Sequence, residues 1–223
     1  MTKRNAVKIA IDVAMLVVLV LLMATALVQE IPHEWLGVSL FVLVTAHFVM
    51  NRRWMAAIPR ARLNALRAVQ LTALAGLITC VLGLMVSSLI ISKHAFAFLP
   101  VLPGVAWARR VHMICSYWMF VLAFVHAGLH ARLPKAQEPS RMWAARVIFA
   151  LVACYGVYSF VQLDMWSYLC GQVYFAAVDY SAPLARTVAR YASVGVLTGG
   201  LFHYIQLALP TQAKHKRNDS RLR

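Results

Sequence analysis

The chain has 223 residues, of which 62% are hydrophobic and only 13% are charged, whereas about a quarter of the residues in ordinary soluble domains are charged. Several apolar runs of roughly 20 residues or more have the length that crosses a bilayer as a helix, so the composition indicates an integral membrane protein and excludes an ordinary soluble domain. The net charge of +15 does not indicate nucleic-acid binding, because the basic residues cluster in short segments between the apolar runs and form no nucleic-acid-binding motif.

Six apolar runs predict an all-α fold in which a bundle of six helices crosses the membrane. The runs occupy residues 9–28, 33–50, 68–92, 105–133, 143–163 and 187–209. No internal repeat is visible and no loop is long enough for a soluble domain, so we expect one transmembrane domain over residues 1–210 and a basic tail over 211–223. Residues 164–186 mix aromatic and acidic side chains, which predicts a short helix at the membrane surface.

The first apolar run has two interpretations. Ala24, Thr25 and Ala26 resemble the cleavage site of a secretory signal peptide. The run is longer than a usual signal-peptide core and passes directly into the second run, which favours a retained membrane helix.

The distribution of Lys and Arg predicts the topology. Seventeen of the 22 basic residues lie in the N-terminal segment, in the connections after the second and fourth runs, and in the tail. Because cytoplasmic segments of membrane proteins are enriched in Lys and Arg, we expect both termini in the cytoplasm.

The cysteines exclude one kind of cofactor attachment. The four residues are far apart in the sequence and form neither a CxxC nor a CxxCH motif: Cys80, Cys115, Cys154 and Cys170. Covalent c-type haem uses CxxCH, so that chemistry is excluded. Three of the four lie inside predicted spans as small apolar fillers, and neither a structural disulfide nor a four-cysteine iron–sulfur cluster is expected.

Histidines inside the spans are the strongest functional signal, because ionisable residues are costly in a membrane and mark functional sites there. The second run holds His33 and His47, and the fourth holds His112 and His126. Both pairs are 14 residues apart, close to four helical turns, so each pair falls near one face of its helix, about 21 Å apart along the axis. Two such helices can hold two flat ligands, one above the other, and bis-histidine haem is the obvious candidate.

The predicted topology determines which histidines pair. The second and fourth runs point the same way, from outside to inside, so His33 and His112 lie near the outer face and His47 and His126 lie deeper. We therefore expect a four-helix core with an outer haem iron between His33 and His112 and an inner one between His47 and His126. Neutral imidazole binds iron, and its second nitrogen needs a hydrogen-bond partner, which the sequence does not identify.

Three residues near these ligands have open roles. His130 lies one turn beyond His126 on nearly the same face, where it either replaces His126 as the inner ligand or lies at the haem rim; the matched spacing favours His126. Arg109 and Arg110 come just before His112, where they either pair with haem propionates or extend to the lipid headgroups.

Other polar residues have plainer interpretations. Asp12 lies near Lys8 and is interpreted as its interfacial ion-pair partner. His94 is expected to be an exposed loop residue. His203 is expected to be a packing or hydrogen-bonding residue, with a functional role as the alternative. Four glycines in the spans either let helices pack closely or leave room for a macrocycle: Gly37, Gly76, Gly83 and Gly128.

Two segments resemble a known family, the flavinylation-associated cytochromes, which are small bacterial membrane cytochromes classed as a domain of unknown function. The family's HEW-LG…H…N-W signature is similar to residues 33–54, HEWLGVSLFVLVTAHFVMNRRW. Its second motif, a leading histidine followed by an H-x-G-x-H end, resembles residues 111–130, and residues 83–100 also resemble the family. The resemblance covers about residues 10–205; it departs at Arg52 and Arg53, which separate Trp54 from Asn51.

The resemblance, together with a histidine spacing similar to that of respiratory b-type cytochromes, implies two b haems and electron transfer across a bacterial inner membrane. We expect the chain to pass electrons between a quinol or reductase donor and an extracytoplasmic partner that carries flavin or haem, as an oxidoreductase subunit rather than a stand-alone enzyme. One alternative is a transporter or channel whose histidines handle protons or metal ions, which predicts water-facing acidic residues in the spans. The other is a non-redox assembly subunit, which predicts that the histidines are dispensable for colour.

Overall fold

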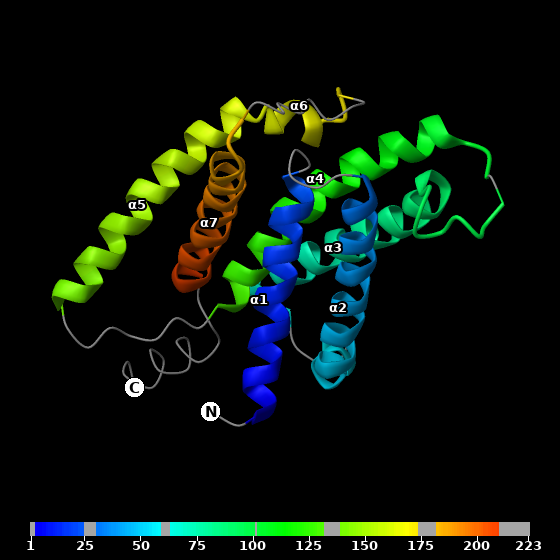
Figure 1. The fold of residues 1–223 in the computed structure, drawn as a ribbon. Coiled ribbons are helices and arrows are strands. Elements are labelled where there is room, and N and C mark those ends of the chain that lie inside the picture. The colour runs from blue at the N-terminus through cyan, green and yellow to red at the C-terminus, as the bar shows by residue number, and fades with distance from the viewer. Residues whose placement is uncertain are drawn as a thin grey trace.

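The structure, a computed structural model, describes residues 3–24, 30–58, 63–100, 102–131, 139–173 and 182–209. Every regular element within these residues is a helix (Figure 1), which confirms the predicted all-α fold. The helices are α1 Lys3–Met23, α2 Glu30–Ala56, α3 Ala65–Ile91, α4 Val105–His130, α5 Pro139–Gln162, α6 Met165–Leu169 and α7 Leu184–Ala208. The predicted basic tail, residues 211–223, lies outside the described residues.

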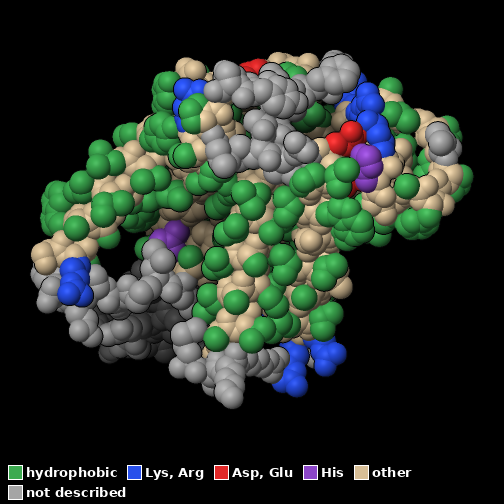
Figure 2. All heavy atoms as spheres, in the orientation of Figure 1, with side chains coloured by type: hydrophobic (Ala, Val, Ile, Leu, Met, Phe, Trp, Pro, Cys, Tyr) green, Lys and Arg blue, Asp and Glu red, His purple; other side chains and the backbone are tan. Residues whose placement is uncertain are grey.

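Five of the described helices, α1 to α5, are long and apolar enough to cross a membrane. α7 has 25 residues but is not among these five, and its polar residues include Arg186, Arg190 and Gln206. In Figure 2, hydrophobic side chains cover the middle of the visible face, while Lys and Arg lie toward its margins. This distribution is expected when the middle of a molecule contacts lipid chains, and the chain is an all-α, multi-pass membrane protein.

α4 is the central helix. It packs along α3 on one side and along α7 on the other, and it also contacts α1 and α6; α5 packs on α7, and α1 pairs with α2 (Figure 1). A side chain at Gly128 would overlap the backbone of Gly199 on α7, and one at Gly83 would overlap Cys115 on α4. Because Gly76 also lies against α4, these glycines serve close helix packing.

Several helices begin earlier than the apolar runs predict. α1 begins at Lys3 rather than at residue 9, and α2 begins at Glu30 and continues past residue 50 to Ala56. An apolar run reports only the part of a helix that matches the lipid, whereas backbone hydrogen bonds extend the same helix into polar turns at the interface.

The first helix is part of the core. Leu19, Val20 and Met23 of α1 and the following Ala24 are buried, and they belong to one apolar cluster with residues of α4, α6 and α7. Thr25 and residue 26, which complete the alternative cleavage site, lie outside the described residues.

The predicted surface helix is present but short. α6 has five residues and follows Asp164, whose φ of 47° lies in the left-handed region and breaks the helical path after α5. Tyr168 of α6 is buried and stacks on Tyr117 of α4 with ring centroids 4.1 Å apart, while Trp166 is exposed. The segment is therefore partly packed into the core; residues 174–181 of the predicted surface segment lie outside the described residues.

Candidate functional site

The four histidines expected to bind haem lie where α2 approaches α4, and all four are half-buried. The rings of His33 and His112 have centroids 6.3 Å apart, and their planes are tilted by 58°. Farther along the helices, His47 lies within electrostatic range of His126. The structure therefore brings the first histidines of the two helices together, and it leaves the second histidines near enough to interact electrostatically.

His112 is anchored by α3. The hydroxyl of Ser87 donates to the carbonyl of Leu84 at 3.1 Å, so its oxygen is available to accept from His112 Nδ1, 3.3 Å away. Ser88 Oγ lies 3.5 Å from the same nitrogen. A proton on Nδ1 leaves the Nε2 lone pair free to bind a metal ion.

His47 is anchored by α1. Its Nδ1 lies 2.7 Å from Asp12 Oδ1, and because an ionised carboxylate can only accept, Nδ1 carries the proton. Nε2 has only a long approach, 3.4 Å, from the Asn51 amide. Lys8 donates to Asn51 Oδ1 at 2.9 Å, so the predicted ion pair between Asp12 and Lys8 is wrong: each has its partner on α2. The matched depths of Asp12 and His47 in two consecutive antiparallel spans were the sequence signal for this contact.

Each histidine pair also contains an imidazole without such an anchor. Among the described residues, the buried Nδ1 atoms of His33 and His126 have no hydrogen-bond partner. A buried polar atom left in this way costs roughly 1–3 kcal/mol. Each pair therefore combines one imidazole whose Nδ1 has a hydrogen-bond partner with one whose Nδ1 has none among the described residues.

His130 lies at the end of α4 and is exposed. Its ring centroid is 4.6 Å from that of His126 and 5.6 Å from that of Trp54, which it meets edge-on. The structure thus places His130 at the edge of the inner pair, next to a tryptophan of α2. It brings both candidates for the inner ligand to the same place.

The spacing of the outer pair suits a shared metal ion. Bonds from a metal to an imidazole nitrogen are about 2 Å long, so two imidazoles on opposite sides of one ion have centroids roughly 6 Å apart. The separation between His33 and His112 is 6.3 Å. Gly37, one turn after His33, has no described atom within 4 Å of the position where a side chain would begin. This leaves space beside α2, and the residues present fit a planar group held by two imidazoles.

Arg109 and Arg110 are exposed in the first two turns of α4. Arg109 precedes His112 by three residues and shares its helix face, whereas Arg110 precedes it by two and points to another side. Helical geometry therefore favours Arg109 as the cationic neighbour of the outer pair.

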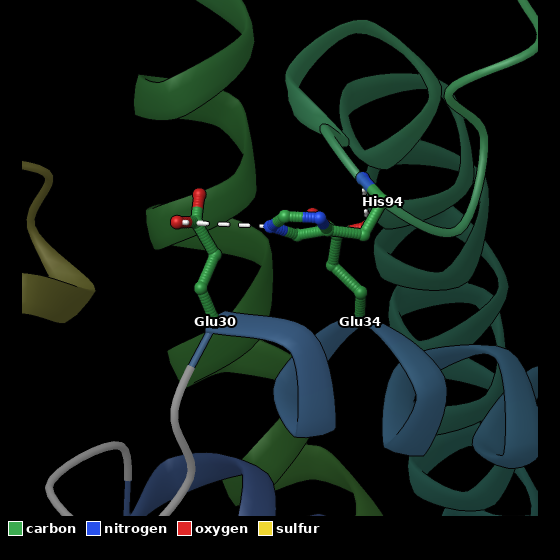
Figure 3. Close-up of side chains that lie close together, drawn as sticks. All are labelled: Glu30, Glu34 and His94. Carbon is green, nitrogen blue, oxygen red and sulfur yellow. Dashed lines mark hydrogen bonds and ion pairs between the residues drawn. The ribbon is translucent and has the colours of Figure 1, made fainter.

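A second polar cluster, missed in the sequence, joins the start of α2 to the end of α3 (Figure 3). Glu34 accepts hydrogen bonds from the Ser92 hydroxyl at 2.6 Å and from the backbone N–H groups of residues 93–95 at 2.9, 3.0 and 2.7 Å. Glu30 lies 4.0 Å from His94. Glu30, Glu34 and His94 are close enough to share a metal ion, but four donors already occupy Glu34 and the other two residues are exposed. The cluster fixes the connection between α3 and α4 beside the outer histidine pair.

The remaining histidines have separate surroundings. His94 is exposed, as predicted, and His203 is half-buried on α7 with its ring 6.1 Å from that of Tyr204. Comparisons of the chain with protein-family models, with curated proteins and with solved structures found no match.

Proposed function

We propose that this protein is a membrane cytochrome that carries electrons across the bacterial inner membrane through two b haems. His33 and His112 would bind the outer iron, and His47 and His126 the inner one. The strongest support is the close approach of the half-buried His33 and His112 between α2 and α4, together with Nδ1 contacts that orient His112 and His47. Haem, when bound, supplies reversible one-electron chemistry at iron.

The chain's own residues prepare the ligands. Ser87 and Asp12 keep the proton on Nδ1 of His112 and His47, so both rings offer Nε2. Partners of this kind fix the tautomer and orientation of a ligating imidazole. Arg109 would pair with a propionate of the outer haem. With about 21 Å between the two levels, the sites cover much of a hydrocarbon core that is about 30 Å thick.

The proposal includes six crossings, with α7 as the sixth span and both termini in the cytoplasm. The start of α1 and the end of α7 lie toward the same side of the molecule (Figure 1), which an even number of crossings requires. The excess of Lys and Arg in the connections on that side supports a cytoplasmic orientation.

The partners follow from the proposed chemistry. A quinol or a reductase would supply electrons, and an extracytoplasmic flavin- or haem-carrying protein would receive them, in line with the resemblance to flavinylation-associated cytochromes. The chain then acts as an oxidoreductase subunit, with lipid around its apolar helices.

The transporter alternative requires acidic residues in water-facing positions of the spans. The described helices that could cross the membrane contain Asp12, Glu30 and Glu34. Each of them is bound to a partner, and Glu30 and Glu34 lie in the first two turns of α2. This arrangement favours the cytochrome.

Spectroscopy of the detergent-purified protein tests the proposal. We expect a b-type spectrum in the dithionite-reduced minus oxidised difference and two haems per chain by the pyridine haemochrome assay. His33→Ala and His112→Ala should each leave one haem, and so should the double variant, because both residues serve the same site. His94→Ala is the matched control and should keep two. Absence of b-type absorbance in haem-replete cells contradicts the cytochrome, and one haem in the wild type contradicts the two pairs.

A further inference from the structure

We propose that the inner haem has the lower reduction potential of the two, because Asp12 makes His47 the most electron-rich of the four axial ligands. This inference rests on the proposed function and extends it to the direction of electron flow.

The contact between Asp12 and His47 is a direct bond to the ligand ring. The 2.7 Å distance from Nδ1 to Oδ1 is typical of a charge-assisted hydrogen bond. A carboxylate partner raises the basicity of a metal-bound imidazole. A more basic imidazole stabilises ferric iron more than ferrous iron, so the reduction potential of that site falls.

The outer ligands have only neutral partners. His112 Nδ1 lies 3.3 Å from Ser87 Oγ and 3.5 Å from Ser88 Oγ, and hydroxyl groups at these distances add much less electron density than a carboxylate. His33 Nδ1 has no partner among the described residues. The two sites therefore differ in the charge that reaches their ligands.

Charges near the outer pair do not remove this difference. Glu34 follows His33, but its carboxylate accepts from four donors around residues 92–95 rather than from an imidazole. Arg109 and Arg110 are exposed at the same end of α4, and positive charge raises the potential of a nearby haem. At the outer site the cations therefore act in the direction of the proposal.

Positive charges near the inner pair act against Asp12, but from farther away. Lys8 donates to Asn51 and not to the ring of His47. Arg52 and Arg53 are exposed, so solvent and salt screen them over a Debye length of about 8–10 Å. The Asp12 side chain is itself 49% exposed, yet its bond to His47 is direct, and we therefore expect its effect to dominate.

The difference in potential sets the direction of electron flow. An electron delivered by a reduced donor at the cytoplasmic face moves downhill to an oxidised acceptor at the outer face. The donor is then a cytoplasmic-side reductase or a quinol oxidised near the inner leaflet, and the acceptor is the extracytoplasmic flavin- or haem-carrying protein.

The first test is a potentiometric titration of the purified wild type and of Asp12→Asn, followed by absorbance. The wild type should titrate as two components. Asp12→Asn should keep two haems and raise only the lower component, by at least about tenfold in its reduction equilibrium constant, which is about 59 mV for one electron. Ser87→Ala is the matched control, and it should leave the lower component unchanged.

A second variant covers the case in which Asp12→Asn loses its inner haem. His47→Ala should remove one haem and, with it, the lower-potential component. Loss of the higher component instead overturns the inference, as does an Asp12→Asn protein with two haems and an unmoved lower component; in both cases the cytochrome itself stands. A wild type without haem contradicts the proposed function and this inference together.

Discussion

His126 and His130 lie one helical turn apart on α4, and their surroundings differ. His126 is half-buried and its Nδ1 has no partner among the described residues, whereas His130 is exposed and its ring packs edge-on against Trp54. Partial burial disfavours the charged imidazolium, and the neutral imidazole is the form that binds iron. This difference favours His126 as the ligand of the proposed inner haem.

Replacing each of these residues by alanine separates their roles. His126→Ala should lower the haem count from two to one, because it removes a proposed ligand of the inner haem. His130→Ala should keep two haems and change the spectrum little. The pyridine haemochrome assay measures both. If His130→Ala loses a haem and His126→Ala does not, His130 is the ligand.

Glu34 is the second residue whose contribution can be measured. Glu34→Gln replaces one acceptor oxygen by an NH2 group that cannot accept from the backbone, so it should lower the free energy of unfolding by roughly 1–3 kcal/mol. Glu30→Gln is the control, because the exposed pair of Glu30 with Lys93 contributes about 0–1 kcal/mol. Thermal unfolding in detergent measures both variants; equal losses would contradict the role of Glu34 in fixing the end of α3.

At the scale of helices, the contact of α4 with α7 depends on Gly128, while Gly37 of α2 borders open space. A side chain at Gly128 would meet the backbone of Gly199, and one at Gly37 would meet no described atom. The backbone of α7 cannot move alone to relieve such an overlap. The two positions therefore serve different purposes.

Gly128→Ala should separate α4 from α7 and destabilise the protein by about 1–3 kcal/mol or more. Gly37→Ala should leave the unfolding temperature nearly unchanged. Detergent thermal unfolding provides the measurement, and a tolerated alanine at residue 128 would contradict the close packing of these two helices.

Gly37→Leu tests the space beside α2. Because the position is open in the fold, the larger side chain should leave the helices folded, but it should lower the haem content if a macrocycle lies there. The ratio of haem to protein and the far-ultraviolet circular dichroism are measured together. Unchanged haem content would place the macrocycle elsewhere.

The long helices could be predicted because each must match the thickness of the bilayer, which sets the length of its apolar run. Their rotation about their own axes could not, because a helix that is apolar on all sides has no periodicity to show which face meets a neighbour. For this reason the spacing of His33 and His47 was visible in the sequence, while their surroundings were not. Ser87 became identifiable only once α3 was placed beside α4. The matched depths of Asp12 and His47 were visible in the sequence, but not which faces of α1 and α2 meet. The role of Glu34 could not be predicted from the sequence because its partners are mostly backbone N–H groups.

At the scale of the whole molecule, the proposed topology places the connection between α3 and α4 outside and the segment before α3 inside. Both contain strongly exposed side chains, at 79% for Phe98 and 72% for Leu63. These two residues can therefore report the orientation.

In a variant without the four native cysteines, Phe98→Cys should react with a membrane-impermeant maleimide in intact spheroplasts, and Leu63→Cys should not. Both should react after permeabilisation, which is the control for accessibility. The reverse pattern would invert the topology, and with it the assignment of inner and outer sites.

Within the described part of the chain, the backbone of α2 packs extensively only against that of α1. Toward α4, α2 contributes histidine side chains. If haem occupies the space between α2 and α4, contacts with the cofactor replace direct packing between these two helices. A ligand that binds only the folded state adds about 4 kcal/mol at a concentration 1,000 times its Kd, so cofactor supply would decide whether α2 stays docked. Cells short of haem would then lose the protein to quality-control proteolysis, and haem availability would determine its abundance.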